Sequence, residues 1–350
     1  MSERFVVAST ITPVTGDQYV SEIPREGSTV VVKRGGKRKT ARLGMEIASG
    51  GEGLIYLVDN TNFVAKIYKR EKLSKRKYEK IELMLTMEIK CEGLCFPLAC
   101  LYNLSNEFVG YLMGAARGKE LQRCVFIPKL LEKTFPDWKK NDTVDLCITI
   151  LKKIKYLHDR NVILGDINPG NILVVSTNEV YFVDTDSYQI EGHPCPVGTI
   201  NFTAPEIQRK PYDKFLRTIG NERFAVATLL FMIMLPGKPP YSIQGGENQI
   251  DNIISMEFSY MLGEFTTGKV PEGPWRYCWS HLPRYLKESF YDTFSKDGKH
   301  NDELTRYSTD DWIQIFEMYK HLLESDDLTV KDDMSRDLFP TRLKKYYGDI

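Results

Sequence analysis

Three side chains that carry oxygen atoms stand at the ends of two short apolar runs. Asp166 and Asn171 lie in one loop around the sequence Asn-Pro-Gly, and Asp184 follows the apolar run 180–183. Each run is typical of a strand, and side chains at strand ends can converge on one point. Carboxylate and amide oxygens are the hard ligands that Mg²⁺ prefers. Because magnesium held beside a free carboxylate is the machinery of phosphoryl transfer, we predict that chemistry here.

The order and spacing of these residues resemble the protein kinase family. Asp166 and Asn171 match the catalytic loop Asp-x-x-x-x-Asn, and residues 184–186 (Asp-Thr-Asp) are similar to the metal-binding motif Asp-Phe-Gly. Residues 204–206 are Ala-Pro-Glu, as in kinases. A single match would more often be a structural turn, but several motifs in kinase order favour the family. The resemblance implies that Asp166 is the catalytic base, that Asn171 binds one Mg²⁺ and that Asp184 is the main metal ligand.

A glycine-rich turn lies nearer the N-terminus, at residues 48–53 (Ala-Ser-Gly-Gly-Glu-Gly). Glycines such as Gly50, Gly51 and Gly53 let a backbone approach phosphate groups closely and present its N–H groups to them. The turn resembles the kinase glycine-rich loop, with alanine in place of the first glycine. The resemblance implies that this turn binds the phosphates of ATP.

Lys66 lies among apolar residues in the strand-like run 64–68, where burial without a partner would be costly. It resembles the lysine of the kinase Val-Ala-x-Lys strand, which implies ATP phosphates and a helix glutamate as partners. The helical pattern over 70–89 supplies two glutamates. Glu82 flanks the apolar stripe of that helix, whereas Glu79 falls nearer its wet face. We therefore expect Glu82 to pair with Lys66, with Glu79 as the alternative.

The adenine contacts expected from the resemblance are apolar or come from the backbone. Residues 109–116 resemble the last strand of the smaller kinase lobe and the hinge that follows it. Met113 would be the gatekeeper, and the backbone of 114–116, including Ala115, would meet adenine. Leu173, which follows the catalytic loop, completes the expected cofactor contacts.

The catalytic loop departs from the kinase pattern. Leu164 and Gly165 replace the usual His-Arg. Without that arginine, a phosphorylated residue in the activation segment (residues 184–206) has no standard partner. We therefore predict activity without phosphorylation of that segment. Asn168 replaces a lysine that neutralises phosphate charge, and as a catalytic residue it could donate a hydrogen bond but no charge. Asp186 replaces a glycine and is expected to support a metal site or to cap a turn.

Three structural contacts follow from the same resemblance. The hydroxyl of Thr199 is expected to hydrogen-bond toward Asp166. Glu206 is expected to pair with Arg306. Glu222 stands where kinases carry an aspartate that stabilises the backbone of the catalytic loop.

Composition narrows the function classes. The 350 residues include 47 basic and 47 acidic ones, and a net charge of zero argues against nucleic acid as the main partner. No apolar run approaches the roughly 20 residues of a membrane span, and the N-terminus lacks the features of a signal peptide. Seven cysteines without a Cys-x-x-Cys pair fit a reduced, cytoplasmic protein.

We expect an α+β fold of the bilobal protein-kinase type. Its N-lobe would be an antiparallel sheet with one main helix, over 45–114, and its C-lobe would be mostly helical, over 115–325. Residues 1–44 would form a β-prone extension, and its basic turn 33–39 is read as a solvated hairpin tip or as a docking patch. Residues 326–350 would form a charged tail.

The leading hypothesis is a phosphotransferase that depends on ATP and Mg²⁺ and phosphorylates serine or threonine of a protein substrate. The chain looks closest to bacterial kinase-like proteins, among them those often fused to helix-hairpin-helix domains, although no such segment is evident here. Asn168 and the missing His-Arg favour a small-molecule kinase or an adenylyl transferase as one alternative. A nucleotide-binding pseudokinase is the other. The chain keeps four catalytic side chains that a scaffold does not need: Lys66, Asp166, Asn171 and Asp184.

Overall fold

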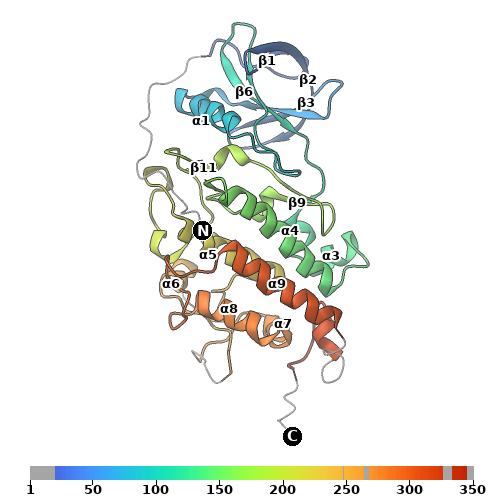
Figure 1. The fold of residues 1–350 in the computed structure, drawn as a ribbon, viewed down its shortest axis with the longest axis vertical. Coiled ribbons are helices and arrows are strands. Elements are labelled where there is room, and N and C mark those ends of the chain that lie inside the picture. The colour runs from blue at the N-terminus through green and yellow to red at the C-terminus, as the bar shows by residue number, and fades with distance from the viewer. Residues whose placement is uncertain (1–19, 247, 264–267, 326–332, 345–350) are drawn as a thin grey trace.

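The structure, a computed structural model, describes residues 20–246, 248–263, 268–325 and 333–344. Two lobes lie one above the other (Figure 1). A barrel of strands and helix α1 make the smaller lobe, and the remaining α-helices make the larger one. The expected bilobal α+β fold is confirmed.

Six antiparallel strands of the smaller lobe close into a barrel in the order β1-β2-β3-β4-β6-β5. Their bounds are β1 (Thr29–Arg34), β2 (Lys37–Ser49), β3 (Gly53–Val58), β4 (Phe63–Tyr68), β5 (Ala99–Tyr102) and β6 (Phe108–Gly114). Aliphatic and aromatic residues suit this arrangement, because they are buried in the barrel on β1, β3, β4, β5 and β6. Strand β2 is exposed along most of its length, with Leu43 as its buried residue. The glycine-rich turn joins β2 to β3, so its position is fixed by two paired strands.

Residues 29–44, which the sequence analysis placed in an extension, are part of this barrel. Strand β1 pairs with β2 across a tight turn at 35–36, and its other edge pairs with β5. The basic side chains 37–39 at the tip of this hairpin are exposed. Residues 1–19 lie outside the described part of the chain.

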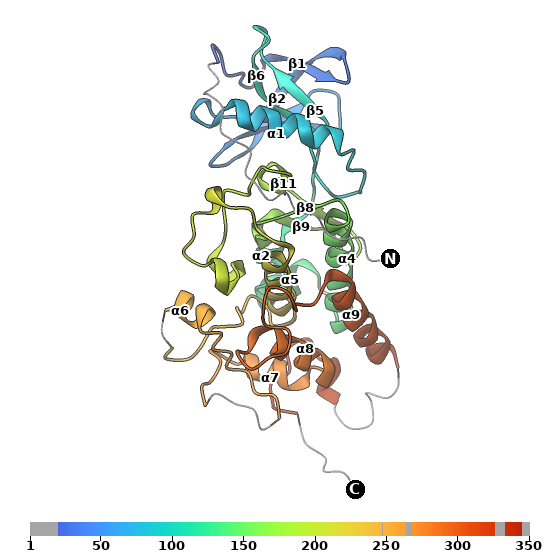
Figure 2. The ribbon, with the colours of Figure 1, turned by 60° about the vertical axis from the view of Figure 1, so that its left-hand side comes forward.

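Helix α1 (Lys75–Thr86) lies between the barrel and strand β11 (Gln189–Ile190), as Figure 2 shows. The hydroxyl of Ser74 accepts a hydrogen bond from the N–H of Lys77 at 3.1 Å and so caps the first turn. Ile81 and Met84 are buried, which agrees with the expected apolar stripe. This placement puts Lys80 of α1 in contact with the loop that follows β10 (Val180–Phe182).

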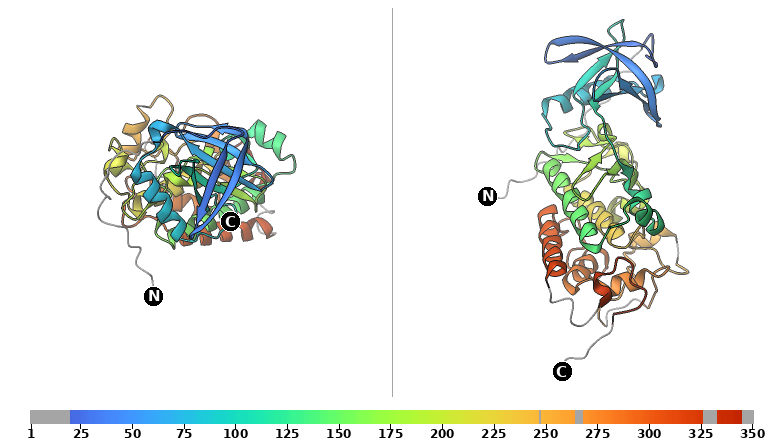
Figure 3. Two further views of the ribbon diagram at one scale, coloured as in Figure 1. Left: turned by 90° about the horizontal axis from the view of Figure 1, so that it is seen from above. Right: turned by 90° about the vertical axis from the view of Figure 1, so that its right-hand side faces the viewer.

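The larger lobe contains eight α-helices among the described residues. They are α2 (Leu121–Cys124), α3 (Pro128–Thr134), α4 (Lys140–His158), α5 (Ile219–Met234), α6 (Gln249–Ile254), α7 (Trp275–His281), α8 (Arg284–Phe294) and α9 (Thr309–Glu324). Helix α5 is buried on nearly every side, and α9 packs against α4 (Figure 3). An apolar helix with no wet face belongs in the middle of a lobe. None of the helices in the described ranges is both long and apolar enough to cross a bilayer.

Two small sheets of the larger lobe lie next to the smaller lobe, as Figure 2 shows. One has the order β10-β9-β7, from β7 (Lys119–Glu120), β9 (Ile172–Val174) and β10 (Val180–Phe182). The other pairs β8 (Val162–Ile163) with β11. These short strands hold the loops that carry the candidate catalytic residues. All seven cysteines are free, and six of them are buried.

Candidate active site

The catalytic loop runs from β8 to β9, and the loop that begins with Asp184 follows β10. Because β9 and β10 are paired, these loops emerge side by side. Asn168 caps a short 3-10 turn over Pro169–Asn171, and its side-chain oxygen accepts from the N–H of Gly170 at 2.9 Å. That contact leaves the two amide N–H groups of Asn168 as donors.

A cavity of about 530 Å³ lies between the lobes. It is lined by eight of the residues expected at the site, namely Gly50, Gly51, Gly53, Lys66, Met113, Asn171, Leu173 and Asp184. Four expected residues do not line it: Glu82, Ala115, Asp166 and Asn168. The cavity is large enough for a nucleotide-sized ligand and has the mixed apolar and polar lining of such sites.

Gly50 and Gly51 differ from Gly53 in what surrounds them. A side chain at Gly53 would meet the carbonyl oxygen of Ile67 at 2.5 Å, so the pairing of β3 with β4 requires this glycine. A side chain at Gly51 would meet no protein atom within 4 Å, and one at Gly50 only a carbonyl oxygen at 3.8 Å. Folding therefore does not require glycine at positions 50 and 51. Close approach of the protein backbone to a bound ligand would require it.

Lys66 is buried, with a side chain 6% exposed, and its amine contacts two carboxylates at once. Its Nζ lies 2.6 Å from Oδ1 of Asp184 and 2.6 Å from Oδ1 of Asp186. Burial opposes the charge on Lys66, but the two carboxylates raise its pKa above the usual range. The expectation that Glu82 is its partner is wrong, because Glu82 is exposed on α1. The alternative, Glu79, pairs with Lys75 at 3.6 Å.

Asp186 is the buried counter-ion of Lys66. Its side chain is 1% exposed and also accepts hydrogen bonds from the hydroxyls of Tyr68 at 2.7 Å and Tyr111 at 2.9 Å. Burial opposes its ionisation, yet Lys66 and Lys77 hold its pKa well below the ordinary value. Because these partners are side chains of strands β4 and β6, the turn-capping role expected for Asp186 is wrong, and its support of a metal site stays a prediction.

Helix α1 is tied to the same residue through a lysine. The amine of Lys80 donates to the backbone carbonyl of Asp186 at 2.7 Å, and burial lowers the pKa of Lys80 to about 8. Lys77, one turn earlier, pairs with Glu52 of the glycine-rich turn at 2.7 Å. The helix thus reaches the site with two lysines where the sequence analysis expected a glutamate.

Asp184 has the left-handed backbone conformation, with φ of 58° and ψ of 33°. Such a conformation is uncommon outside glycine, and it occurs at sites where side-chain direction matters. The side chain remains 42% exposed and lines the cavity together with Asn171. One carboxylate and one amide oxygen suit Mg²⁺ when nucleotide phosphates supply further ligands. Within the described ranges, no group of three or more His, Cys, Asp and Glu could hold a metal by itself.

Asp166 has the contacts expected of it. The hydroxyl of Thr199 donates to Oδ1 of Asp166 at 2.9 Å, which confirms that prediction. Burial raises the pKa of Asp166, while the hydrogen bond from Thr199 opposes that rise. Glu222 accepts hydrogen bonds from the N–H groups of Leu164 at 2.8 Å and Gly165 at 3.0 Å, so its expected role is also confirmed.

The hinge follows β6 and differs from expectation at one residue. Met113 is buried and lines the cavity, followed by Gly114 and Ala116. The N–H of Ala115 instead donates to the carbonyl of Asn62 at 3.2 Å. The expectation of a ligand contact at Ala115 is wrong, because alternate residues of an extended segment point to opposite sides.

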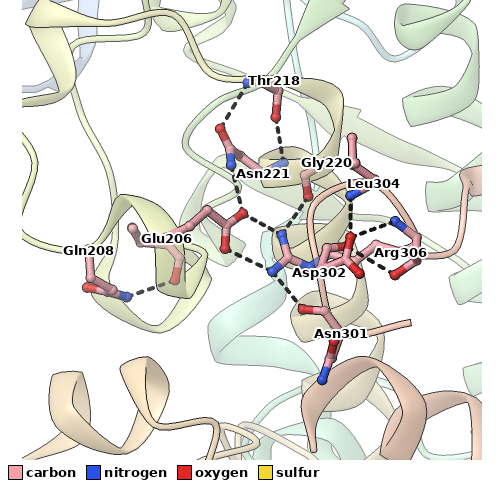
Figure 4. A network of polar contacts seen from close by, with 11 residues as sticks. Glu206, Gln208, Thr218, Gly220, Asn221, Asn301, Asp302, Leu304 and Arg306 are labelled. Carbon is pink, nitrogen blue, oxygen red and sulfur yellow. Dashed lines mark hydrogen bonds and ion pairs between the residues drawn. The ribbon is translucent and has the colours of Figure 1, made fainter. Parts of the chain in front are cut away.

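Glu206 and Arg306 form the expected ion pair, shown in Figure 4. Nη1 of Arg306 lies 2.6 Å from Oε1 of Glu206, and Nη2 lies 2.9 Å from Oε2. The guanidinium also donates to the carbonyls of Gly220 at 3.0 Å and Asn301 at 3.1 Å. Asn221 donates to Glu206 at 2.8 Å. The network joins the end of the activation segment to α5 and to the loop before α9.

A Glu206→Gln variant should be less stable than the wild type by about 2 kcal/mol, because hydrogen bonds to a charged group weaken and buried Arg306 loses its counter-ion. Urea denaturation would measure the loss. Glu288→Gln, which alters an exposed pair with Arg284, is the matched control and should change stability little. Equal stability of the two variants would contradict this role.

Several residues of the site were not anticipated from the sequence. They are Tyr68, Tyr111 and Lys80, which bind Asp186, Cys95, which lines the cavity, and Arg217, which donates to backbone carbonyls of the activation segment. A signal existed for the two tyrosines, since Tyr68 lies two residues after Lys66 and Tyr111 is paired with it across the sheet. Nothing local marks Lys80, Cys95 or Arg217.

Comparison with known proteins agrees with this geometry. The protein kinase domain model matches residues 42–309. The chain belongs to the protein kinase family. Protein kinase YegI of Escherichia coli K12 is 26% identical over 269 residues, which cover 73% of this chain and 41% of YegI. Calcium/calmodulin-dependent protein kinase type 1 of Caenorhabditis briggsae is 23% identical over 228 residues, covering 61% of this chain and 60% of that protein.

A third relative is a serine/threonine-protein kinase by name. Serine/threonine-protein kinase PLK4 of Nematostella vectensis is 24% identical over 136 residues, covering 37% of this chain and 13% of that protein. The chain spans less than half the length of the two YegI proteins it matches. These likenesses agree with the kinase motifs in the cavity and in the activation segment.

Proposed function

We propose that the chain is a protein kinase that transfers the γ-phosphoryl group of ATP, with Mg²⁺, to serine or threonine of a protein. The observation that carries the proposal is the cavity in which Lys66, Asn171 and Asp184 meet the glycine-rich turn. The family membership and the likeness to PLK4, a serine/threonine-protein kinase, support a Ser/Thr acceptor.

The residues divide the work by their chemistry. Lys66 and the backbone of the glycine-rich turn would bind the phosphates of ATP. Asn171 and Asp184 would hold Mg²⁺, which supplies charge neutralisation when it is bound. Asp166 would orient the acceptor hydroxyl and take its proton, and Asn168 would donate a hydrogen bond near the transferred group. Positioning and electrostatics would supply most of the acceleration.

Two alternatives have specific support. The uncharged Asn168 favours a small-molecule kinase or an adenylyl transferase, since the usual lysine charge is missing from the catalytic loop. The ion pair of Lys66 with both Asp184 and Asp186 favours a pseudokinase, because Asp184 would have to release the lysine in order to hold metal.

Nucleotide transfer with two labels distinguishes these functions. The protein and its Asp166→Ala variant would be incubated with Mg²⁺ and ATP labelled at either the α- or the γ-phosphate, with generic protein acceptors. Transfer of the γ-label alone, lost in the variant, is the expected result. Transfer of the α-label would show adenylylation, and ATP binding without transfer of either label would favour a pseudokinase or a small-molecule acceptor.

The wider assignments are also proposals. We infer a cytoplasmic bacterial protein with a protein substrate, allied to the kinase-like proteins often fused to helix-hairpin-helix domains. We propose 115–325 as the main part of the C-lobe. The expectation that 326–350 is a tail is wrong for its described part, residues 333–344, because Leu338 and Phe339 pack against the core and the carbonyl of Leu338 accepts from buried Lys140 at 3.1 Å. Because residues 29–44 belong to the barrel, we propose that the N-lobe extends from about residue 29 to residue 114.

A further inference from the structure

Arg217 lies beside the catalytic loop but belongs to none of the kinase motifs. Arg217 is buried, with 3% of its surface exposed. Its guanidinium donates to two backbone carbonyls of the activation segment, that of Cys195 at 3.1 Å through Nη1 and that of Val197 at 2.6 Å through Nη2. The same group lies over the ring of Tyr212, 4.7 Å from its centroid. A planar fork bound in this way fixes the direction of both peptide groups.

Two glycines make room for this guanidinium. A side chain at Gly165 would lie 2.7 Å from Nη1 of Arg217, and one at Gly198 would lie 2.8 Å from Nη2. Gly165 has a φ of +74°, a conformation that other residues rarely adopt. Gly165 also stands where the kinase pattern has an arginine. The guanidinium of Arg217, which comes from another part of the chain, therefore occupies space that a side chain at position 165 would need.

The backbone of Arg217 is held as firmly as its side chain. The side chain of buried Gln189 accepts from the N–H of Arg217 at 2.8 Å and donates to its carbonyl at 2.7 Å. Gln189 is in β11, which pairs with β8 directly before the catalytic loop. The arginine is thus connected to the start of the catalytic loop and to the activation segment.

We propose that Arg217 is a positioning residue that orders the activation segment without a phosphate group. Val197, which it binds, lies shortly before Thr199, whose hydroxyl donates to Asp166 at 2.9 Å. Arg217 acts on the reaction through this segment and does not line the nucleotide cavity. The inference rests on the proposed function, and it names the side chain that makes a phosphorylated residue unnecessary.

The test compares Arg217→Lys with Arg284→Lys, since the guanidinium of Arg284 is 87% exposed on α8. Lysine keeps the charge but lacks the fork that reaches two carbonyls. We expect kcat to fall by about 100-fold in Arg217→Lys, the loss typical when a distant change displaces the reacting groups slightly, with KM for ATP unchanged. Hydrogen exchange should quicken in the peptide 191–203 of that variant. The Arg284→Lys control should match the wild type, and phosphatase treatment should leave wild-type activity intact.

Unchanged kcat and unchanged hydrogen exchange in a folded Arg217→Lys protein would overturn the proposal. Loss of wild-type activity after phosphatase treatment would overturn it as well. Should Arg217→Lys not fold, Gly198→Ala crowds Nη2 of Arg217 together with the ring of Tyr212 on which the guanidinium lies, and the same two readouts apply to it. If the wild type transfers no label, the proposed kinase function fails, while hydrogen exchange still decides whether Arg217 orders the segment.

Discussion

An Asp186→Ala variant is expected to unfold with a free energy about 3–5 kcal/mol lower than that of the wild type, because breaking a buried ion pair leaves the buried charge of Lys66 only partly compensated. The side chain of Lys66 is 6% exposed, so its amine would keep only the contact with Asp184. The hydroxyls of Tyr68 and Tyr111 would lose their acceptor in the same step. Chemical denaturation followed by circular dichroism would measure the change.

Asp213→Ala is the matched control for this prediction. The Asp213 side chain is 52% exposed and pairs with neighbouring Lys214 at the surface. Its removal is expected to change stability by less than about 0.5 kcal/mol. Similar values for the two variants would show that the pair between Lys66 and Asp186 does not stabilise the folded protein.

An Asp166→Asn variant is expected to lose about 10²–10⁴-fold in the rate of γ-phosphoryl transfer, the range typical of a lost general base. Asparagine retains an oxygen that can accept from Thr199, so the activation segment should keep its place. Asp166 does not line the nucleotide cavity, so the Kd for ATP should be unchanged. Single-turnover kinetics and calorimetric titration with ATP would measure the two quantities. A rate close to that of the wild type would remove Asp166 from the mechanism.

The dependence of the rate on pH offers a separate check on Asp166. Burial raises the pKa of Asp166, and the Thr199 hydrogen bond opposes the rise. As the pH is lowered, Asp166 is therefore protonated, and the rate falls, at a pH above the ordinary pKa of aspartate. Thr199→Val removes the opposing contact and should move the acidic limb of kcat to higher pH. A limb that stays in place would mean that another group controls it.

The kinase motifs predicted most of the catalytic architecture because each depends on a short stretch of chain. Glu222 beneath the catalytic loop, Thr199 on Asp166 and Glu206 on Arg306 are all present in the structure. These contacts follow from the family fold, and they could be assigned by position along the chain. The same holds for the apolar stripe of α1 and for the bilobal fold.

The partner of Lys66 could not be assigned in this way. Helical periodicity placed Glu82 beside the buried stripe, but it does not fix how the helix turns toward the other lobe. The structure turns Lys80 inward and leaves Glu82 exposed. Aspartate in place of glycine at position 186 was the one sign in the sequence of a different partner for Lys66. The contact itself depends on the fold of the turn that follows Asp184, which has the left-handed conformation.

Arg217 escaped prediction for a similar reason. It is distant in sequence from the carbonyls of the activation segment that it binds. A single arginine also carries no periodic signal. The two glycines that make room for it, Gly165 and Gly198, are visible in the sequence. That both lie next to the guanidinium of Arg217 is seen only in the three-dimensional structure.

The measurement that tests the central claim most directly is the rate of γ-phosphoryl transfer in Asp186→Asn beside Glu82→Gln. The claim is that Asp186, rather than a helix glutamate, holds the lysine of a phosphoryl-transfer site. We expect Glu82→Gln to equal the wild type, and Asp186→Asn to lose about 100-fold, since a misplaced Lys66 no longer orients the phosphates. A large loss in Glu82→Gln with a normal rate in Asp186→Asn would contradict the claim.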